Sequence, residues 1–122
     1  MLVLGGVKQR VEWSDAGVWL DLVPLPEDAD QRYIEQTMTE VRDDDGKLTN
    51  IHRDTARYAQ LVGRHCIKDW GGVVDADGQP VACTPEAIDD LMRISQAQEF
   101  VFSRVKGLAL YRRQEIDDAG NA

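Results

Sequence analysis

Residues 67–91 read IKDWGGVVDADGQPVACTPEAIDDL, and this stretch carries the clearest local signals in the chain. The tetrapeptide Asp75–Gly78 predicts a tight turn, because aspartate side chains accept bonds from nearby amides and glycine supplies positive φ. Thr84, Pro85 and Glu86 predict a helix start, with threonine as the N-cap, proline at the first helical position and an acid in the first turn. The stretch is therefore expected to lead from the exit of one helix, through Trp70 and a turn, into the next helix.

Apolar residues at helical spacing predict a helix on each side of this stretch. The first is expected from Asn50, a good N-cap residue, to Cys66, with a charged outer face. The last is expected over residues 97–113, and the tail 117–122 is expected to fray. The apolar positions of these two helices are Ile51, Thr55, Tyr58, Ala59, Val62 and Cys66 in the first, and Phe100, Val101, Val105, Leu108 and Tyr111 in the last.

The N-terminal part of the chain predicts a β-hairpin. Residues 9–13 alternate between polar and apolar, residues 18–23 are rich in strand-forming types, and residues 14–17 (Ser-Asp-Ala-Gly) form a turn sequence between them. Pro24 and Pro26 are expected to end this hairpin, because each lacks a backbone donor.

Residues 27–49 allow two interpretations. An acidic opening followed by Tyr33, Ile34, Met38 and Val41 at helical spacing favours a helix that starts near Asp28. The alternation after residue 36 instead favours a strand, with residues 43–47 (Asp-Asp-Asp-Gly-Lys) turning a second hairpin. We favour the helix, and the sequence leaves the structure of residues 35–49 open. The chain as a whole is predicted to be a single, mainly helical α+β domain over residues 1–122, with an N-terminal β-hairpin followed by three or four helices.

Composition narrows the range of partners. The chain has 122 residues, 43% of them hydrophobic, and a formal net charge of −8. Such a charge repels phosphate, so we expect no binding to nucleic acid or to an anionic membrane surface. No apolar run approaches the roughly 20 residues that span a bilayer, and the opening MLVLGG does not look like a signal peptide. We therefore expect a location in the cytoplasm, where Cys66 and Cys83 stay reduced.

No motif in the sequence points to catalysis or to a cofactor. Placing Gly78 or Gly46 at the sixth position of a calcium loop leaves Thr84 or His52 where a glutamate is needed. The histidines and cysteines lack the spacings of a zinc site, and no base or oxyanion cradle accompanies either cysteine. Phosphate loops and dinucleotide fingerprints are also absent. We predict no catalytic, cofactor-binding or metal-binding residues; a small hydrolase with carboxylates that no motif reveals is a remote alternative.

Residues 70–81 (WGGVVDADGQPV), the Thr84-Pro85-Glu86 helix start and the phenylalanine-containing segment 100–105 resemble a pattern in small tail proteins of long-tailed bacteriophages and prophages. In those proteins a helix ends in a W-x-x-V-x-D-x-D-G-x-P turn, followed by a T-P-E helix start and a last helix with phenylalanine. The resemblance covers residues 67–110, and Trp19 fits a looser G-x-W element in the N-terminal hairpin. The family includes tail assembly chaperones, which coat the tape-measure protein and are not incorporated in the virion.

The resemblance implies a non-enzymatic, chaperone-like tail assembly protein in the cytoplasm of a bacterial host. Its implied partners are the tape-measure protein, the tube protein or further copies of itself. A structural virion component, such as a tail-completion or head–tail connector subunit, is the alternative. Phe100 and Phe102 point about 200° apart on a helix, so one core face cannot easily bury both, and Phe102 is the preferred exposed anchor. The predicted partner-binding residues are Trp70, Phe100, Phe102, Val105, Tyr111, Arg112 and Arg113.

Overall fold

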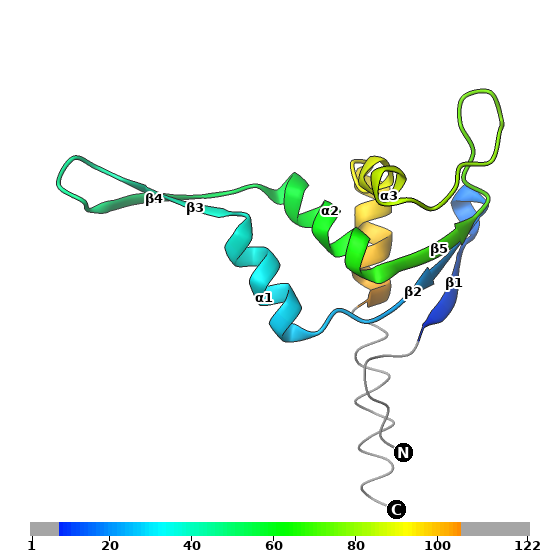
Figure 1. Ribbon diagram of the computed structural model, residues 1–122, viewed down its shortest axis with the longest axis horizontal. Coiled ribbons are helices and arrows are strands. Elements are labelled where there is room, and N and C mark those ends of the chain that lie inside the picture. The colour runs from blue at the N-terminus through cyan, green and yellow to red at the C-terminus, as the bar shows by residue number, and fades with distance from the viewer. Residues whose placement is uncertain (1–7, 106–122) are drawn as a thin grey trace, which may run out of the picture.

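The computed structural model of the protein describes residues 8–105 and shows an α+β domain with an N-terminal β-hairpin and two small antiparallel sheets (Figure 1). The predicted fold class is confirmed. The elements are β1 (Gln9–Trp13), a 3-10 turn η1 (Ser14–Ala16), β2 (Val18–Leu22), α1 (Glu27–Gln36), β3 (Met38–Arg42), β4 (Leu48–Arg53), α2 (Thr55–Cys66), β5 (Ile67–Gly71), α3 (Pro85–Leu91) and a last helix over residues 95–105, called helix 95–105 below.

The first sheet has the strand order β1-β2-β5, with both pairs antiparallel. The β1–β2 hairpin agrees with the prediction from sequence. The third strand does not, because residues 67–71 were expected only as the exit of a helix. Instead Leu20 pairs with Trp70 and Trp19 pairs with Gly71. The close approach depends on glycine, since a Cβ on Gly71 would lie 2.1 Å from the indole nitrogen of Trp19.

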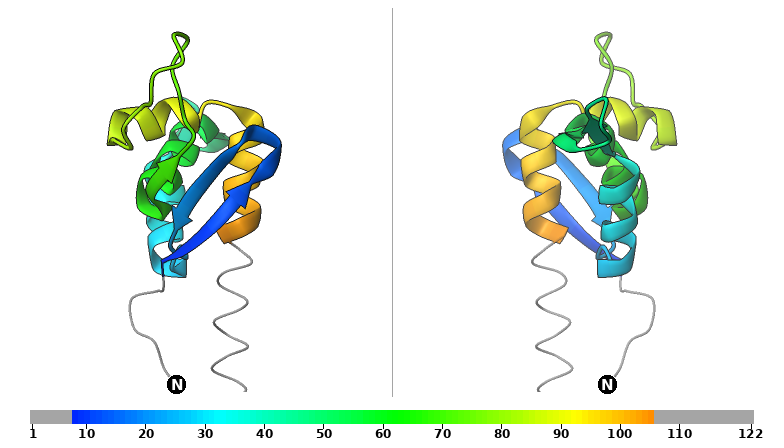
Figure 2. Two further views of the ribbon diagram at one scale, coloured as in Figure 1. Left: turned by 90° about the vertical axis from the view of Figure 1, so that its right-hand side faces the viewer. Right: turned by 90° about the vertical axis from the view of Figure 1, so that its left-hand side faces the viewer.

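The helices gather on one face of this sheet, as the two side views in Figure 2 show. The core between them and the sheet is made of buried aliphatic side chains together with Cys66 and Trp70. Helix α2 can approach Met92, the residue after α3, only because position 63 is glycine: a Cβ on Gly63 would lie 2.4 Å from the Cγ of Met92. The core residues are Leu20, Leu22, Ala59, Val62, Cys66, Ile67, Trp70, Ile88, Met92, Val101 and Val105.

The other face of the sheet carries an ion pair between the exposed side chain of Arg10 and the buried carboxylate of Asp21. The guanidinium of Arg10 donates to Asp21 over 2.9 Å and lies 3.6 Å from the centroid of the Trp19 ring. Asp21 is only 4% exposed, so its charge depends on this partner. The guanidinium of Arg10 holds the pKa of the Asp21 carboxyl below its usual range.

A two-stranded arm, formed by the β3–β4 hairpin, projects away from the rest of the domain (Figure 1). Both interpretations of residues 27–49 are thus right in part: α1 is a helix from Glu27, and the chain then enters a hairpin that turns at Asp43–Gly46. The predicted helix start at Asn50 is wrong. Asn50 pairs with Val41 inside β4, and the N-cap of α2 is Asp54, whose carboxylate accepts the Arg57 amide over 3.0 Å.

The turn and the helix start of residues 72–86 are confirmed. Asp75 accepts bonds from the amides of Asp77 and Gln79 at 2.9 and 3.0 Å, and Gly78 has a φ of 79°. Thr84 accepts the amide of Ala87 at 3.2 Å, and proline occupies the first turn of α3. The same turn geometry appears in the arm, where Asp43 accepts the amides of Asp45 and Lys47.

The last helix begins two residues earlier than predicted, at residue 95 rather than 97. The remainder of its predicted range, residues 106–113, and the tail 117–122 lie outside the described residues.

Candidate binding groove

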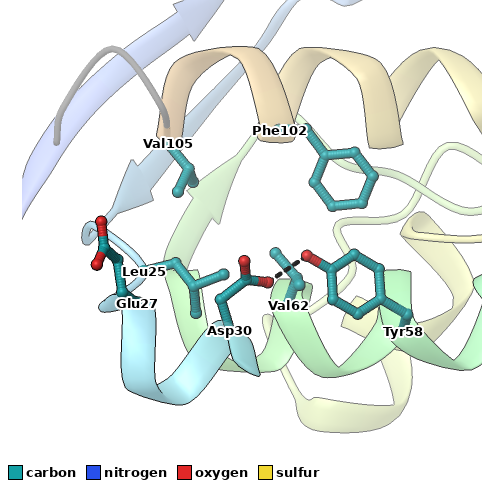
Figure 3. A pocket seen from close by; sticks show the side chains of 7 residues that line it. All are labelled: Leu25, Glu27, Asp30, Tyr58, Val62, Phe102 and Val105. Atoms are coloured by element: carbon teal, nitrogen blue, oxygen red, sulfur yellow. Dashed lines mark hydrogen bonds between the residues drawn. The ribbon is translucent and has the colours of Figure 1, made fainter. Parts of the chain in front are cut away.

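A groove of about 290 Å³ opens between α1, α2 and helix 95–105 (Figure 3). We call it the Asp30 groove. Its walls are mostly apolar, and its polar groups come from the first turn of α1 and from Tyr58 of α2. The lining residues are Leu25, Glu27, Asp30, Tyr58, Val62, Phe102 and Val105.

Asp30 and Tyr58 form the polar centre of the Asp30 groove. The Tyr58 hydroxyl donates a short hydrogen bond to the Asp30 carboxylate, which ties α1 to α2 (Figure 3). Burial, this hydrogen bond and the charge of Asp30 raise the pKa of Tyr58 to about 12. The hydroxyl therefore stays protonated at neutral pH and acts as a donor.

The opposite wall is aromatic and aliphatic. The rings of Tyr58 and Phe102 lie 6.1 Å apart, centre to centre, with a tilt of 36° between their planes. Val105 lies one turn further along the same helix, and Leu25 faces it from the chain before α1 (Figure 3). This combination of an apolar wall and a single polar centre is typical of sites that orient an apolar ligand or side chain.

The predicted partner-binding residues are distributed over several places. Phe102 and Val105 line the Asp30 groove together; Phe102 is half-buried and Val105 is buried. Phe100 lies elsewhere, where its ring stacks on Trp13 of β1 at 5.2 Å. Trp70 is 6% exposed and belongs to the core. The other predicted residues, Tyr111, Arg112 and Arg113, lie outside the described residues.

The sequence did not single out Asp30, Leu25 or Val62 for binding. Asp30 read as part of an acidic helix start, and Tyr58 and Val62 read as members of a core-facing stripe. The signal in the sequence is that Tyr58 places a phenol hydroxyl within a mostly apolar stripe, and a half-buried hydroxyl requires a polar partner.

The two cysteines and His65 have surroundings or partners that lower their reactivity. Burial raises the pKa of the Cys66 thiol to about 12 and also raises that of Cys83, so neither is a thiolate at neutral pH. Nδ1 of His65 is hydrogen-bonded to the Tyr33 hydroxyl at 2.8 Å, and burial lowers the pKa of the imidazole. Within residues 8–105, no three His, Cys, Asp or Glu side chains are grouped so that they could hold a metal ion.

A second groove, with a smaller volume of about 220 Å³, lies between α3 and the turn that follows β5. Val74 and Ile94, which are 55% and 49% exposed, are among the residues that line it. Asp90 adds a carboxylate to an otherwise apolar lining.

In the part of the chain that the structure describes, no helix is long and apolar enough to cross a membrane.

Residues 27–121 match the protein-family model described as YdaY prophage protein. The chain belongs to the YdaY prophage protein family. The matched residues include α1, the arm, α2, β5, α3 and helix 95–105, so all three helices around the Asp30 groove lie within the matched region. The β1–β2 hairpin precedes the matched region.

Two other comparisons found nothing similar: no curated protein and no solved structure matches this YdaY family member. The family match confirms that the chain is a prophage protein, as the sequence predicted, and it assigns the chain no role in a phage tail.

Proposed function

We propose that this prophage protein is a non-enzymatic, chaperone-like tail assembly protein that binds a long helical partner of the tape-measure type. The observation that carries the proposal is the Asp30 groove, which lies between three helices and has a mostly apolar lining that includes Phe102 and Val105. Grooves of this kind receive the apolar face of an amphipathic helix. The turn and helix-start motifs of residues 70–86, which resemble those of phage tail proteins, support the same role.

The non-enzymatic part of the proposal is supported by the state of the reactive groups. Both cysteines are held as thiols, and His65 is engaged by Tyr33. The buried Asp21 and half-buried Asp89 carboxylates are each bound by an arginine. Such groups stabilise the fold and are poorly placed to act on a substrate.

A structural virion component is the second candidate, and the arm favours it. Every residue from Met38 to Arg53 is exposed, and the arm carries Met38, Val41, Leu48 and Ile51 with exposed fractions of 36% to 46%. A two-stranded hairpin is marginally stable alone, and apolar residues on such an arm suit contact with a neighbouring subunit. Finding the protein in purified virions would favour this candidate over a chaperone, which leaves before the particle matures.

Co-expression with the tape-measure-type protein of the same prophage tests the leading proposal. We expect a soluble complex with the wild-type chain and a clearly weaker one with Phe102→Asp. Because a charge at a half-buried position can also disturb folding, Phe102→Ala and Phe100→Ala form a matched pair. Both remove one phenyl ring from the same helix, but only Phe102 lines the Asp30 groove.

Near-ultraviolet circular dichroism confirms that each variant is folded before binding is compared. The proposal requires that Phe102→Ala weaken the complex more than Phe100→Ala does. Failure of the wild-type chain to form any complex with the tape-measure-type protein would contradict the proposed function.

A further inference from the structure

The charge environment of the Asp30 groove suggests what chemical group it accepts. Among the carboxylates of residues 8–105, Asp21 is buried, Asp30 and Asp89 are half-buried, and the others are exposed. Asp21 is bound by Arg10 at 2.9 Å, and Asp89 is bound by Arg64 through two contacts of 2.8 and 2.5 Å. Asp30 instead has the neutral hydroxyl of Tyr58 as its hydrogen-bond partner.

A half-buried carboxylate is normally paired with a cation, because desolvation of an unpaired charge costs free energy. Arg53, at the base of the arm, is near enough for its charge to act on Tyr58, but no salt bridge joins it to Asp30. The hydrogen bond from Tyr58 engages one carboxylate oxygen of Asp30. The second oxygen is available for a donor that enters the groove.

The other side chains that line the groove indicate which further chemical groups the ligand carries. Leu25, Val62 and Val105 are aliphatic, and the rings of Tyr58 and Phe102 stand 6.1 Å apart beside the carboxylate. Lysine and arginine side chains combine an aliphatic stem with a terminal cation, and the cation is attracted both to a carboxylate and to an aromatic face. Glu27 adds a further carboxylate to the lining, and the chain as a whole carries a net charge of −8.

We propose that the Asp30 groove binds a lysine or arginine side chain of a protein partner, with the aliphatic stem along Leu25 and Phe102 and the cation on Asp30. This inference deepens the proposed function and rests on it, since it specifies the residue type that the helical partner inserts. The acidic surface steers basic segments toward the groove, and the carboxylate fixes the register of the partner helix. Phe102 supplies the apolar contact and Asp30 the specificity.

A titration with small probes tests the groove without any partner. The full chain, labelled with ¹⁵N, is titrated with Nα-acetyl-lysine methylamide, with the arginine analogue and with the uncharged norleucine analogue. We expect amide shifts at Tyr58, Val62 and Phe102 with the two cationic probes and none with norleucine. Equal shifts from norleucine would show that the groove recognises only apolar surface and would overturn the inference.

The matched variants are Asp30→Asn and Asp28→Asn. Both residues lie in the first turn of α1 and both changes remove one charge, but Asp28 is exposed and does not line the groove. The amide oxygen of asparagine still accepts the hydrogen bond from Tyr58, so folding should persist. We expect Asp30→Asn to abolish the shifts caused by the cationic probes, whereas Asp28→Asn should preserve them.

The complex with the tape-measure-type protein then identifies the source of the cation. We expect Asp30→Asn to weaken that complex about tenfold, which is the effect of losing one partly buried charge pair, and Asp28→Asn to leave it within twofold. If the wild-type chain binds and Asp30→Asn binds equally well, the inference fails while the proposed function stands. If the small cations bind but the wild-type chain forms no complex with the tape-measure-type protein, the groove binds a small cationic molecule and the proposed protein partner is wrong.

Discussion

The indole nitrogen of Trp70 lies 2.8 Å from the carbonyl oxygen of Val81 and donates a hydrogen bond to it. Trp70 lies one residue before the end of strand β5 and Val81 follows the Asp75 turn, so this bond closes the chain between residues 70 and 81. Backbone bonds close the segment further, from the amide of Val81 to the carbonyl of Val73 and from the amide of Asp75 to the carbonyl of Gln79, both at 2.9 Å. The Trp70 side chain therefore anchors the turn segment that leads from β5 toward α3.

Replacing Trp70 with phenylalanine should destabilise the protein by about 2–4 kcal/mol. The loss combines an unsatisfied carbonyl at Val81, which costs about 1–3 kcal/mol, with the space left by the smaller ring. Urea unfolding followed by circular dichroism measures the effect. Trp13→Phe is the control, because Trp13 stacks on Phe100 and phenylalanine preserves a stacked ring. Equal midpoints for the two variants would mean that the Trp70 bond contributes little.

Thr84→Ala should lower the free energy of unfolding by about 1 kcal/mol, because the amide of Ala87 loses its side-chain acceptor at the start of α3. Thr84→Ser should be close to neutral, since serine caps equally well. Both variants are measured by chemical denaturation under the same conditions. An alanine variant as stable as the serine variant would remove the role of Thr84 as a cap.

Gly78→Val should destabilise the turn after β5 by about 1–3 kcal/mol through backbone strain, because Gly78 has a φ of 79°. Contacts with other parts of the protein do not contribute, since beyond the neighbouring residues no atom lies within 4 Å of the position that a Cβ would occupy. Gly78→Asn should cost less, because asparagine tolerates left-handed φ better than a β-branched residue. The order glycine, asparagine, valine in denaturation midpoints checks this, and any other order contradicts it.

The Arg10–Asp21 pair should make stability depend on pH on the acid side. The pKa of Asp21 is lowered in the folded protein, chiefly by the hydrogen bond from Arg10, relative to 3.8 when unpaired. The pair therefore contributes fully above pH 3.8, and the contribution is lost as the pH falls from there through the folded pKa. We expect Asp21→Asn to be less stable than wild type at pH 7, with the difference shrinking by pH 3. An exposed control, Asp15→Asn, should show no such convergence; a constant difference for Asp21→Asn would refute the assignment.

The parts of the fold that the sequence predicted well depend on short-range chemistry. The Asp75 turn and the Thr84 cap lie within five residues of the groups they bind, and both are present. The start of α2 was misplaced because Ile51 happens to continue the helical stripe of Tyr58 and Val62. Pairing with Val41 across the arm draws Asn50 into a strand instead, a contact that helical spacing cannot reveal.

Strand β5 and the Asp30 groove could not be predicted for a related reason. Trp70 joins the sheet through Leu20, a partner at a large distance along the chain. The groove likewise unites Asp30, Tyr58 and Phe102 from three helices. Phe102 and Val105 were found because both lie on one helix, whereas the acidic partner of the site depends on how α1 packs against α2.

The base of the arm is closed by a single backbone bond, from the amide of Asp54 to the carbonyl of Thr37 at 2.8 Å. The two ends of the arm therefore lie next to each other. The arm itself, residues 38–53, is an insertion between α1 and α2. We therefore expect that changes in the length or sequence of the arm leave the domain that carries it folded. For the experimenter, it is a site where a fluorescent or affinity label can be grafted at a distance from the Asp30 groove.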